Sequence, residues 1–197
     1  YEGHIGYGND GATTEEEYER RCFEAMDILA ETADSIETEG ITVDEVMAGS
    51  TATALYTGKH PAVTEIHPGM YPFNDVRLYR CTPFVSKDDC AVTVLSTVIS
   101  KPTPNRAVVD AGSKTISLDI DDTPEPRFRD DISYYKASEE HGWIDTSNAD
   151  EPVEVGDRIE FIVPHVCTTI NLHDVLLGIQ NGHVSDLWEV AARGKQK

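Results

Sequence analysis

The chain of 197 residues carries 36 acidic against 16 basic residues, a formal net charge of −20, and 39% of its residues are hydrophobic. This length fits one large domain or two small ones. The negative charge disfavours nucleic acid and anionic membranes as partners, because phosphate binding requires a basic surface. No apolar run approaches the roughly 20 residues of a membrane span. An acidic surface is typical of proteins from high-salt sources, and equally of ordinary acidic cytoplasmic proteins.

Up to residue 80 the sequence predicts alternating helices and strands. The expected elements are a helix over 13–39, strands over 41–48 and 63–66, a turn over 49–53, and a short helix over 54–56. Thr14 and Glu17 form a capping box at the start of the long helix, and Gly40 suits its C-terminal cap. This order is typical of an α/β unit with a parallel sheet.

From residue 81 to residue 197 the sequence predicts a mostly antiparallel β domain. The expected strands lie over 90–99, 107–110, 159–163, 175–180 and 183–190. Asn181 and Gly182 predict a tight hairpin between the last two strands, and the acidic, proline-bearing residues 119–131 predict a loop. The four cysteines form no CxxC pair or dense framework, which predicts free thiols in a reducing cytoplasm.

His165 and Cys167 are the first candidates for chemistry. If the strand over 159–163 continues through them, the two side chains point to the same face. An imidazole and a thiol suit zinc, and a site with only two protein ligands leaves positions open for water or substrate. The alternative interpretation is a satisfied histidine beside a small buried thiol.

Other segments give weaker signals. Residues 49–51 and 69–70 follow predicted strands, where backbone amides could hold a phosphate, although plain turns remain an alternative. The acidic segment 138–142 could supply a proton donor, a metal ligand or a substrate clamp, or form a solvated loop. Lys114 follows a Gly-Ser turn and is interpreted as a surface residue, because nothing nearby in sequence would activate its amine.

Seven segments, spread in one order over essentially the whole chain, resemble the D-threonine aldolase and D-serine dehydratase family. They are residues 1–4, 47–51, 64–75, 109–114, 138–142, 164–174 and 188–194. Members of this family resemble alanine racemase in fold. The resemblance implies an α/β plus β protein, in which residues 1–80 are the C-terminal part of an alanine-racemase-like (β/α)8 barrel and the β domain follows. It also implies a homodimer.

The resemblance further implies a pyridoxal 5'-phosphate (PLP) enzyme, a lyase that acts on D-β-hydroxy amino acids with a divalent metal, Zn2+ or else Mn2+, Mg2+ or Co2+. Residues implied for the cofactor phosphate are Gly49, Ser50, Thr51, Gly69 and Met70, with Tyr71 close to it. His67 takes the position at which alanine racemases place an arginine facing the pyridine nitrogen. His165 and Cys167 match the family's metal pair.

One departure from the family is large. The Schiff-base lysine of the family belongs to its N-terminal part, and this chain begins at Tyr1, past that position. We therefore expect the missing N-terminal half elsewhere, on a longer or a companion chain. Cys167 favours dehydration of D-serine or D-3-hydroxyaspartate, because the aldolases tend to carry Asp there. A D-threonine aldolase, an amino-acid racemase and a non-catalytic metal-binding or dimerisation module remain alternatives.

Overall fold

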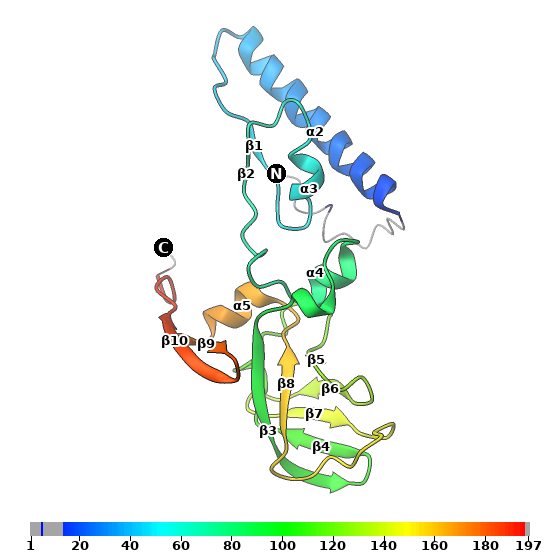
Figure 1. The fold of residues 1–197 in the computed structure, drawn as a ribbon. Coiled ribbons are helices and arrows are strands. Elements are labelled where there is room, and N and C mark those ends of the chain that lie inside the picture. Colours follow the sequence, from blue (N-terminus) through cyan, green and yellow to red (C-terminus); the bar gives the residue numbers. More distant parts are fainter. Residues whose placement is uncertain (1–4, 6–13, 196–197) are drawn as a thin grey trace. The chain divides into compact units, whose positions relative to one another are not determined.

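The computed structural model describes residue 5 and residues 14–195, and the chain divides into two compact units, Tyr1–Asp89 and Cys90–Lys197 (Figure 1). The sequence predicts this boundary at residue 80. The resembling segment over residues 1–4 lies outside the described residues. Within the described part of the chain, no helix has the length and apolar character needed to cross a membrane.

The first unit begins with the long helix α2 (Glu15–Thr38), close to the predicted bounds. Thr14 caps it by accepting a hydrogen bond from the Glu17 amide, and Gly40 takes the expected positive φ of 83° just after it. Tyr18, buried on this helix, packs its ring against Tyr56 and donates its hydroxyl to the Ala52 carbonyl at 2.8 Å. This buried contact attaches the turn over 49–53 to α2.

The remaining elements of this unit are β1 (Met47–Ala48), α3 (Ala54–Thr57), β2 (Glu65–Ile66), α4 (Val76–Cys81) and a 3-10 turn, η1 (Lys87–Asp89). β1 and β2 pair in parallel, which confirms the predicted α/β order (Figure 1). Both strands are much shorter than the predicted 41–48 and 63–66. Parallel sheets are normally covered on both faces, yet Met47 and Ile66 are 47% and 41% exposed.

The second unit contains a six-stranded antiparallel sheet in the order β5-β8-β3-β4-β7-β6. Its strands are β3 (Thr93–Thr103), β4 (Arg106–Val109), β5 (Glu125–Pro126), β6 (Ser133–Ala137), β7 (Gly142–Asp145) and β8 (Arg158–Ile162). The mostly antiparallel character is as predicted, but the predicted loop over 119–131 also contains β5. Phe161 and Tyr134 pack edge to face in the core of this unit, at a centroid distance of 5.5 Å.

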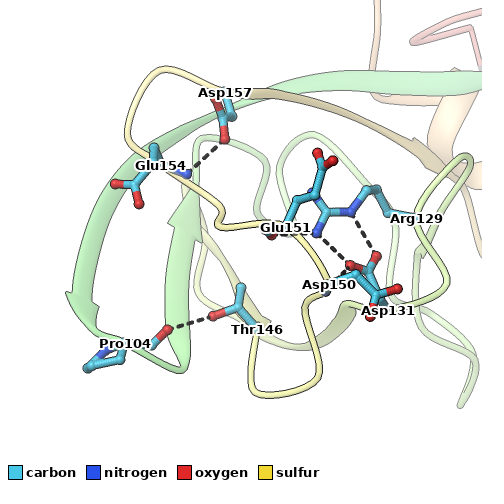
Figure 2. A network of polar contacts seen from close by, with 8 residues as sticks. All are labelled: Pro104, Arg129, Asp131, Thr146, Asp150, Glu151, Glu154 and Asp157. Atoms are coloured by element: carbon cyan, nitrogen blue, oxygen red, sulfur yellow. Dashed lines mark hydrogen bonds and ion pairs between the residues drawn. The ribbon is translucent and has the colours of Figure 1, made fainter.

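A polar network joins two loops of this unit (Figure 2). The Arg129 guanidinium donates two hydrogen bonds to the Asp131 carboxylate, at 2.7 and 2.6 Å, and a third to the Glu151 carbonyl at 2.9 Å. Asp131 also accepts from the Asp150 amide at 2.8 Å. The hydrogen bonds from Arg129 and from the Asp150 amide hold the pKa of Asp131 well below its usual range, because they favour the charged carboxylate.

The second unit ends with α5 (Val166–Asn171) and a hairpin of β9 (Val175–Gln180) and β10 (His183–Glu189). Asn181 and Gly182 have φ values of 52° and 77°, so the predicted hairpin turn is confirmed. Five apolar side chains that share one face of the hairpin are 40–63% exposed. They are Val175, Leu177, Ile179, Val184 and Leu187.

Candidate functional site

The prediction that the strand over 159–163 continues through His165 and Cys167 is wrong. β8 ends at Ile162, and Pro164 follows, which has no N–H to continue the ladder. His165 is instead the extended N-cap residue of α5, with φ −139° and ψ 110°, and Cys167 lies in the first turn of that helix. The spacing of a strand therefore does not explain how the two side chains are placed.

The turn into α5 nevertheless brings the two side chains together. The pKa of His165 is raised to about 9, first by a hydrogen bond with the Cys167 side chain and then by Asp119, while burial opposes the shift. Cys167 is an exposed free thiol. The two side chains thus meet at the start of α5, where His165 is the N-cap residue and Cys167 lies in the first turn.

Asp119 is the residue that the sequence analysis missed. Its Oδ2 lies 2.8 Å from His165 Nδ1, and its Oδ1 accepts hydrogen bonds from the hydroxyls of Ser117 and Thr168, at 2.7 and 2.9 Å. Burial alone would raise the pKa of Asp119, but these hydrogen bonds together lower it to about 2. In the sequence, Asp119 is distinguished only by lying in an acidic stretch, and the other carboxylates of that stretch share this property.

The donor set fits a divalent metal held by two protein ligands. Among the described residues, no group of three or more His, Cys, Asp or Glu side chains is arranged to hold a metal ion. A histidine whose second nitrogen bonds a carboxylate is nevertheless the usual arrangement around protein-bound zinc, and a thiol is a good zinc ligand. His165 and Cys167 therefore suit an open site whose other positions are filled from outside this group.

In the first unit, the two predicted phosphate turns touch each other. The Met70 amide donates to Thr51 Oγ1 at 2.8 Å, which connects the turn after β1 to the turn after β2. Ser50 and Thr51 are buried, and Gly49 has a φ of 90°, where a Cβ would lie 3.3 Å from the Ile66 side chain. Small residues, hydroxyls and backbone amides at the ends of two parallel strands fit the phosphate of a cofactor.

The remaining predicted residues of this unit lie in the turn after β2. His67 donates its backbone amide to the Ala48 carbonyl at 3.0 Å, and its Nε2 lies 2.8 Å from Glu65 Oε1. The Tyr71 side chain is 64% exposed, and a Cβ at Gly69 would have no neighbour within 4 Å. The side chains of His67 and Tyr71 are therefore exposed in this turn.

The acidic segment over 138–142 forms ion pairs with Lys114. The Lys114 ammonium lies 2.7 Å from Glu140 and 3.1 Å from Glu139, and these hydrogen bonds raise its pKa. A Schiff-base lysine needs the opposite shift, because its amine must lose a proton to attack. The geometry agrees with the interpretation of Lys114 as a surface residue.

Comparisons with known proteins agree with these features. Residues 91–179 match the family model described as "Putative serine dehydratase domain". The 3-hydroxy-D-aspartate aldolase of Paracoccus denitrificans is 33% identical over 173 residues, which cover 85% of this chain and 44% of that protein. An uncharacterised protein of Mycobacterium tuberculosis is 36% identical over 132 residues, 61% of this chain and 93% of that protein. The chain belongs to the D-threonine aldolase and D-serine dehydratase family.

Solved structures of this family have the same fold. D-threonine aldolase from Filomicrobium marinum matches with a TM-score of 0.83 and 30% identity, over 91% of this chain and 50% of that one. D-threo-3-hydroxyaspartate dehydratase from Delftia sp. HT23 matches with a TM-score of 0.68 and 26% identity, over 88% and 49%. An alanine-racemase-like protein from Idiomarina loihiensis, 21% identical, matches in fold with a TM-score of 0.80. These matches confirm the predicted fold class.

The chain spans about half the length of the named aldolases and dehydratase that it matches. The D-threonine aldolase of Arthrobacter sp, for example, is 31% identical over 186 residues, which are 92% of this chain and 48% of that protein.

Proposed function

We propose that the chain is part of a PLP- and divalent-metal-dependent lyase that dehydrates D-β-hydroxy amino acids, D-serine or D-3-hydroxyaspartate. The observation that carries this proposal is the His165–Cys167 pair at the start of α5, with Asp119 on the other ring nitrogen of the histidine. When bound, the cofactor would withdraw electrons from the substrate's α-carbon and the metal would polarise the β-hydroxyl.

The first unit would hold the cofactor phosphate. Gly49, Ser50 and Thr51 would contact it from the turn after β1, and Gly69 and Met70 from the turn after β2. The hydrogen bond between Met70 and Thr51 supports this role, because it keeps the two turns at one place. The phosphate would accept hydrogen bonds from hydroxyls and amides there.

His67 and Tyr71 would lie beside the cofactor. We propose that His67 faces the pyridine nitrogen, and that Glu65 fixes its orientation through the 2.8 Å contact at Nε2. That contact leaves Nδ1 as the ring atom able to meet the cofactor nitrogen. Tyr71, 64% exposed, would cover the phosphate side.

The second unit would hold the metal. His165 and Cys167 would bind it, Zn2+ first and otherwise Mn2+, Mg2+ or Co2+, and the open positions would receive the substrate hydroxyl and water. Cys167 rather than a carboxylate at this position favours zinc and dehydration. Aldol cleavage to glycine and an aldehyde is the second candidate, because three of the relatives above 30% identity are named aldolases.

The Schiff-base lysine would come from the family's other half, on a longer or a companion chain, and the enzyme would be a homodimer. The exposed apolar residues on the two-stranded parallel sheet support a missing neighbour, because such strands are normally buried in a larger sheet. None of the four cysteines, all of which are described residues, forms a disulfide, which supports a cytoplasmic location.

The test is a product assay of the enzyme that contains this chain and the family's N-terminal half, loaded with PLP and Zn2+. Pyruvate and ammonia from D-serine are the expected products. Glycine and an aldehyde from D-threonine would identify an aldolase instead. Racemisation that survives chelation of the metal would identify a racemase, and no reaction with any of these substrates would leave a non-catalytic module.

A further inference from the structure

We infer that Asp119 is a positioning residue for the metal site: it holds the His165 imidazole by Nδ1, so that Nε2 is presented to the metal. This inference rests on the proposed metal pair. It adds a residue that belongs neither to that pair nor to any segment of the family resemblance.

The direction of the hydrogen bond follows from the chemistry of the two partners. A carboxylate has no proton to donate, so at 2.8 Å from Asp119 Oδ2 the His165 Nδ1 must be the donor. In the neutral ring that a metal requires, a proton on Nδ1 leaves the lone pair on Nε2. The contact therefore selects one of the two nitrogens for metal binding.

Asp119 is itself held in place before any metal binds. The hydroxyls of Ser117 and Thr168 both donate to Oδ1, which leaves Oδ2 directed at the histidine. Thr168 lies on α5 one residue after Cys167, so the same helix turn supplies a proposed metal ligand and a donor to Asp119. The carboxylate cannot rotate away from His165 without losing at least one of these bonds.

The segment that carries Asp119 makes two further contacts, one with α5 and one with the residues just after it. The Ser117 amide donates to Thr169 Oγ1 at 3.2 Å, and His173 Nε2 lies 2.9 Å from the Thr115 carbonyl oxygen. Residues 115–119 thus make contacts from the N-cap residue of α5, His165, to His173 just beyond the helix. This attachment makes the position of Asp119 relative to His165 a property of the fold rather than of one flexible loop.

The experiment measures Zn2+ binding to the 197-residue chain by calorimetry, with a chelator as competitor. We expect Asp119→Ala to weaken Zn2+ binding by about 10- to 100-fold, the usual effect of removing a carboxylate behind a metal-bound histidine. Asp119→Asn should fall between this variant and the wild type, because its amide oxygen can still accept from Nδ1. Asp121→Asn, which removes an exposed carboxylate of the same stretch, is the matched control and should bind as the wild type does.

A second readout separates positioning from general damage. In the Zn2+-loaded wild type, the ring 15N signals of His165 should show a protonated Nδ1 and a metal-bound Nε2. In Asp119→Ala the Nδ1 proton should exchange rapidly or the metal should move to Nδ1, with the circular dichroism spectrum unchanged. Unchanged ring signals together with unchanged affinity would overturn the inference.

The same Zn2+ titration tests the metal pair and the role of Asp119 separately. If His165→Ala and Cys167→Ala bind Zn2+ as the wild type does, the metal pair is wrong and the inference fails with it. If those variants lose Zn2+ and Asp119→Ala does not, the metal pair stands and only the role of Asp119 is refuted.

Discussion

A single methyl group added at Gly112 is predicted to disturb the second unit. A Cβ on this residue would lie 2.5 Å from three backbone atoms: Ser138 O, Glu139 O and His141 N. Ordinary contacts begin at 3.4 Å, so the loop over 138–141 would have to retreat by about 0.9 Å. Backbone cannot rotate out of the way as a side chain can, and the whole loop must move.

The magnitude follows from what this movement breaks. The amides of Ser113 and Lys114 donate to the carbonyls of Ser138 and Glu139, both at 3.0 Å. A retreat of about 0.9 Å takes both distances beyond hydrogen-bond range, a loss of about 2 kcal/mol for the two bonds. Overpacking adds about 1–3 kcal/mol. Gly112→Ala should therefore lower the free energy of unfolding by about 3–5 kcal/mol.

Urea unfolding followed by tryptophan fluorescence measures this effect on the correct unit, because Trp143 and Trp188, the chain's two tryptophans, both lie in it. Gly156→Ala is the matched control. Gly156 has a φ of 100°, but an added methyl group would meet nothing within 4 Å, so the change should cost about 1–2 kcal/mol through backbone strain alone. Equal losses for the two variants, or a loss under about 1 kcal/mol at Gly112, would refute the steric argument.

Three further predictions concern burial, pH and thiol chemistry. Phe161→Ala should lower the free energy of unfolding by about 3–5 kcal/mol, because the ring is fully buried, whereas Ile179→Ala, 63% exposed, should change it by less than about 0.5 kcal/mol in the same urea assay. Burial raises the pKa of Tyr134 to about 12, above the value near 10 of the unfolded chain. The stability that depends on its neutral form is therefore complete below pH 10 and is lost as the pH rises toward 12, at up to about 1.4 kcal/mol per pH unit. Unfolding curves at pH 9–12 should show this slope in the wild type and a smaller one in Tyr134→Phe; identical slopes would contradict the assignment. Iodoacetamide should alkylate the exposed Cys167 before the buried Cys90, as read by peptide mass spectrometry, and Zn2+ should slow the reaction at Cys167; alkylation unaffected by Zn2+ would argue against a metal ligand there.

Local sequence signals predicted the helices and turns well where they depend on neighbouring residues. The capping box at Thr14 and the positive φ at Gly40 were confirmed, as was the Asn181–Gly182 turn. Each of these depends on the conformational preference of one or two residues, which distant parts of the chain do not alter. The predicted strands over 41–48 and 63–66 were too long, because strand length depends on partners that a local pattern does not specify.

In the candidate metal site, too, local features could be predicted from the sequence and long-range contacts could not. The sequence marked His165 and Cys167 by their residue types, but the strand geometry offered for them was wrong, since Pro164 ends the ladder and a helix begins. Asp119 could not be chosen from among the acidic residues around it, because its role depends on a contact across 46 positions of the chain.

The sequence by itself determined the family, the α/β plus β order of elements and the residue types available for chemistry. Tertiary structure decided which of those residues meet. Thr51 and Met70, 19 positions apart, meet because β1 and β2 pair in parallel, and Asp119 reaches His165 because residues 115–119 are fastened along α5. Hydrogen bonds act over about 3 Å. A carboxylate or hydroxyl therefore acquires its function only where folding brings it to its partner from a distant position in the chain.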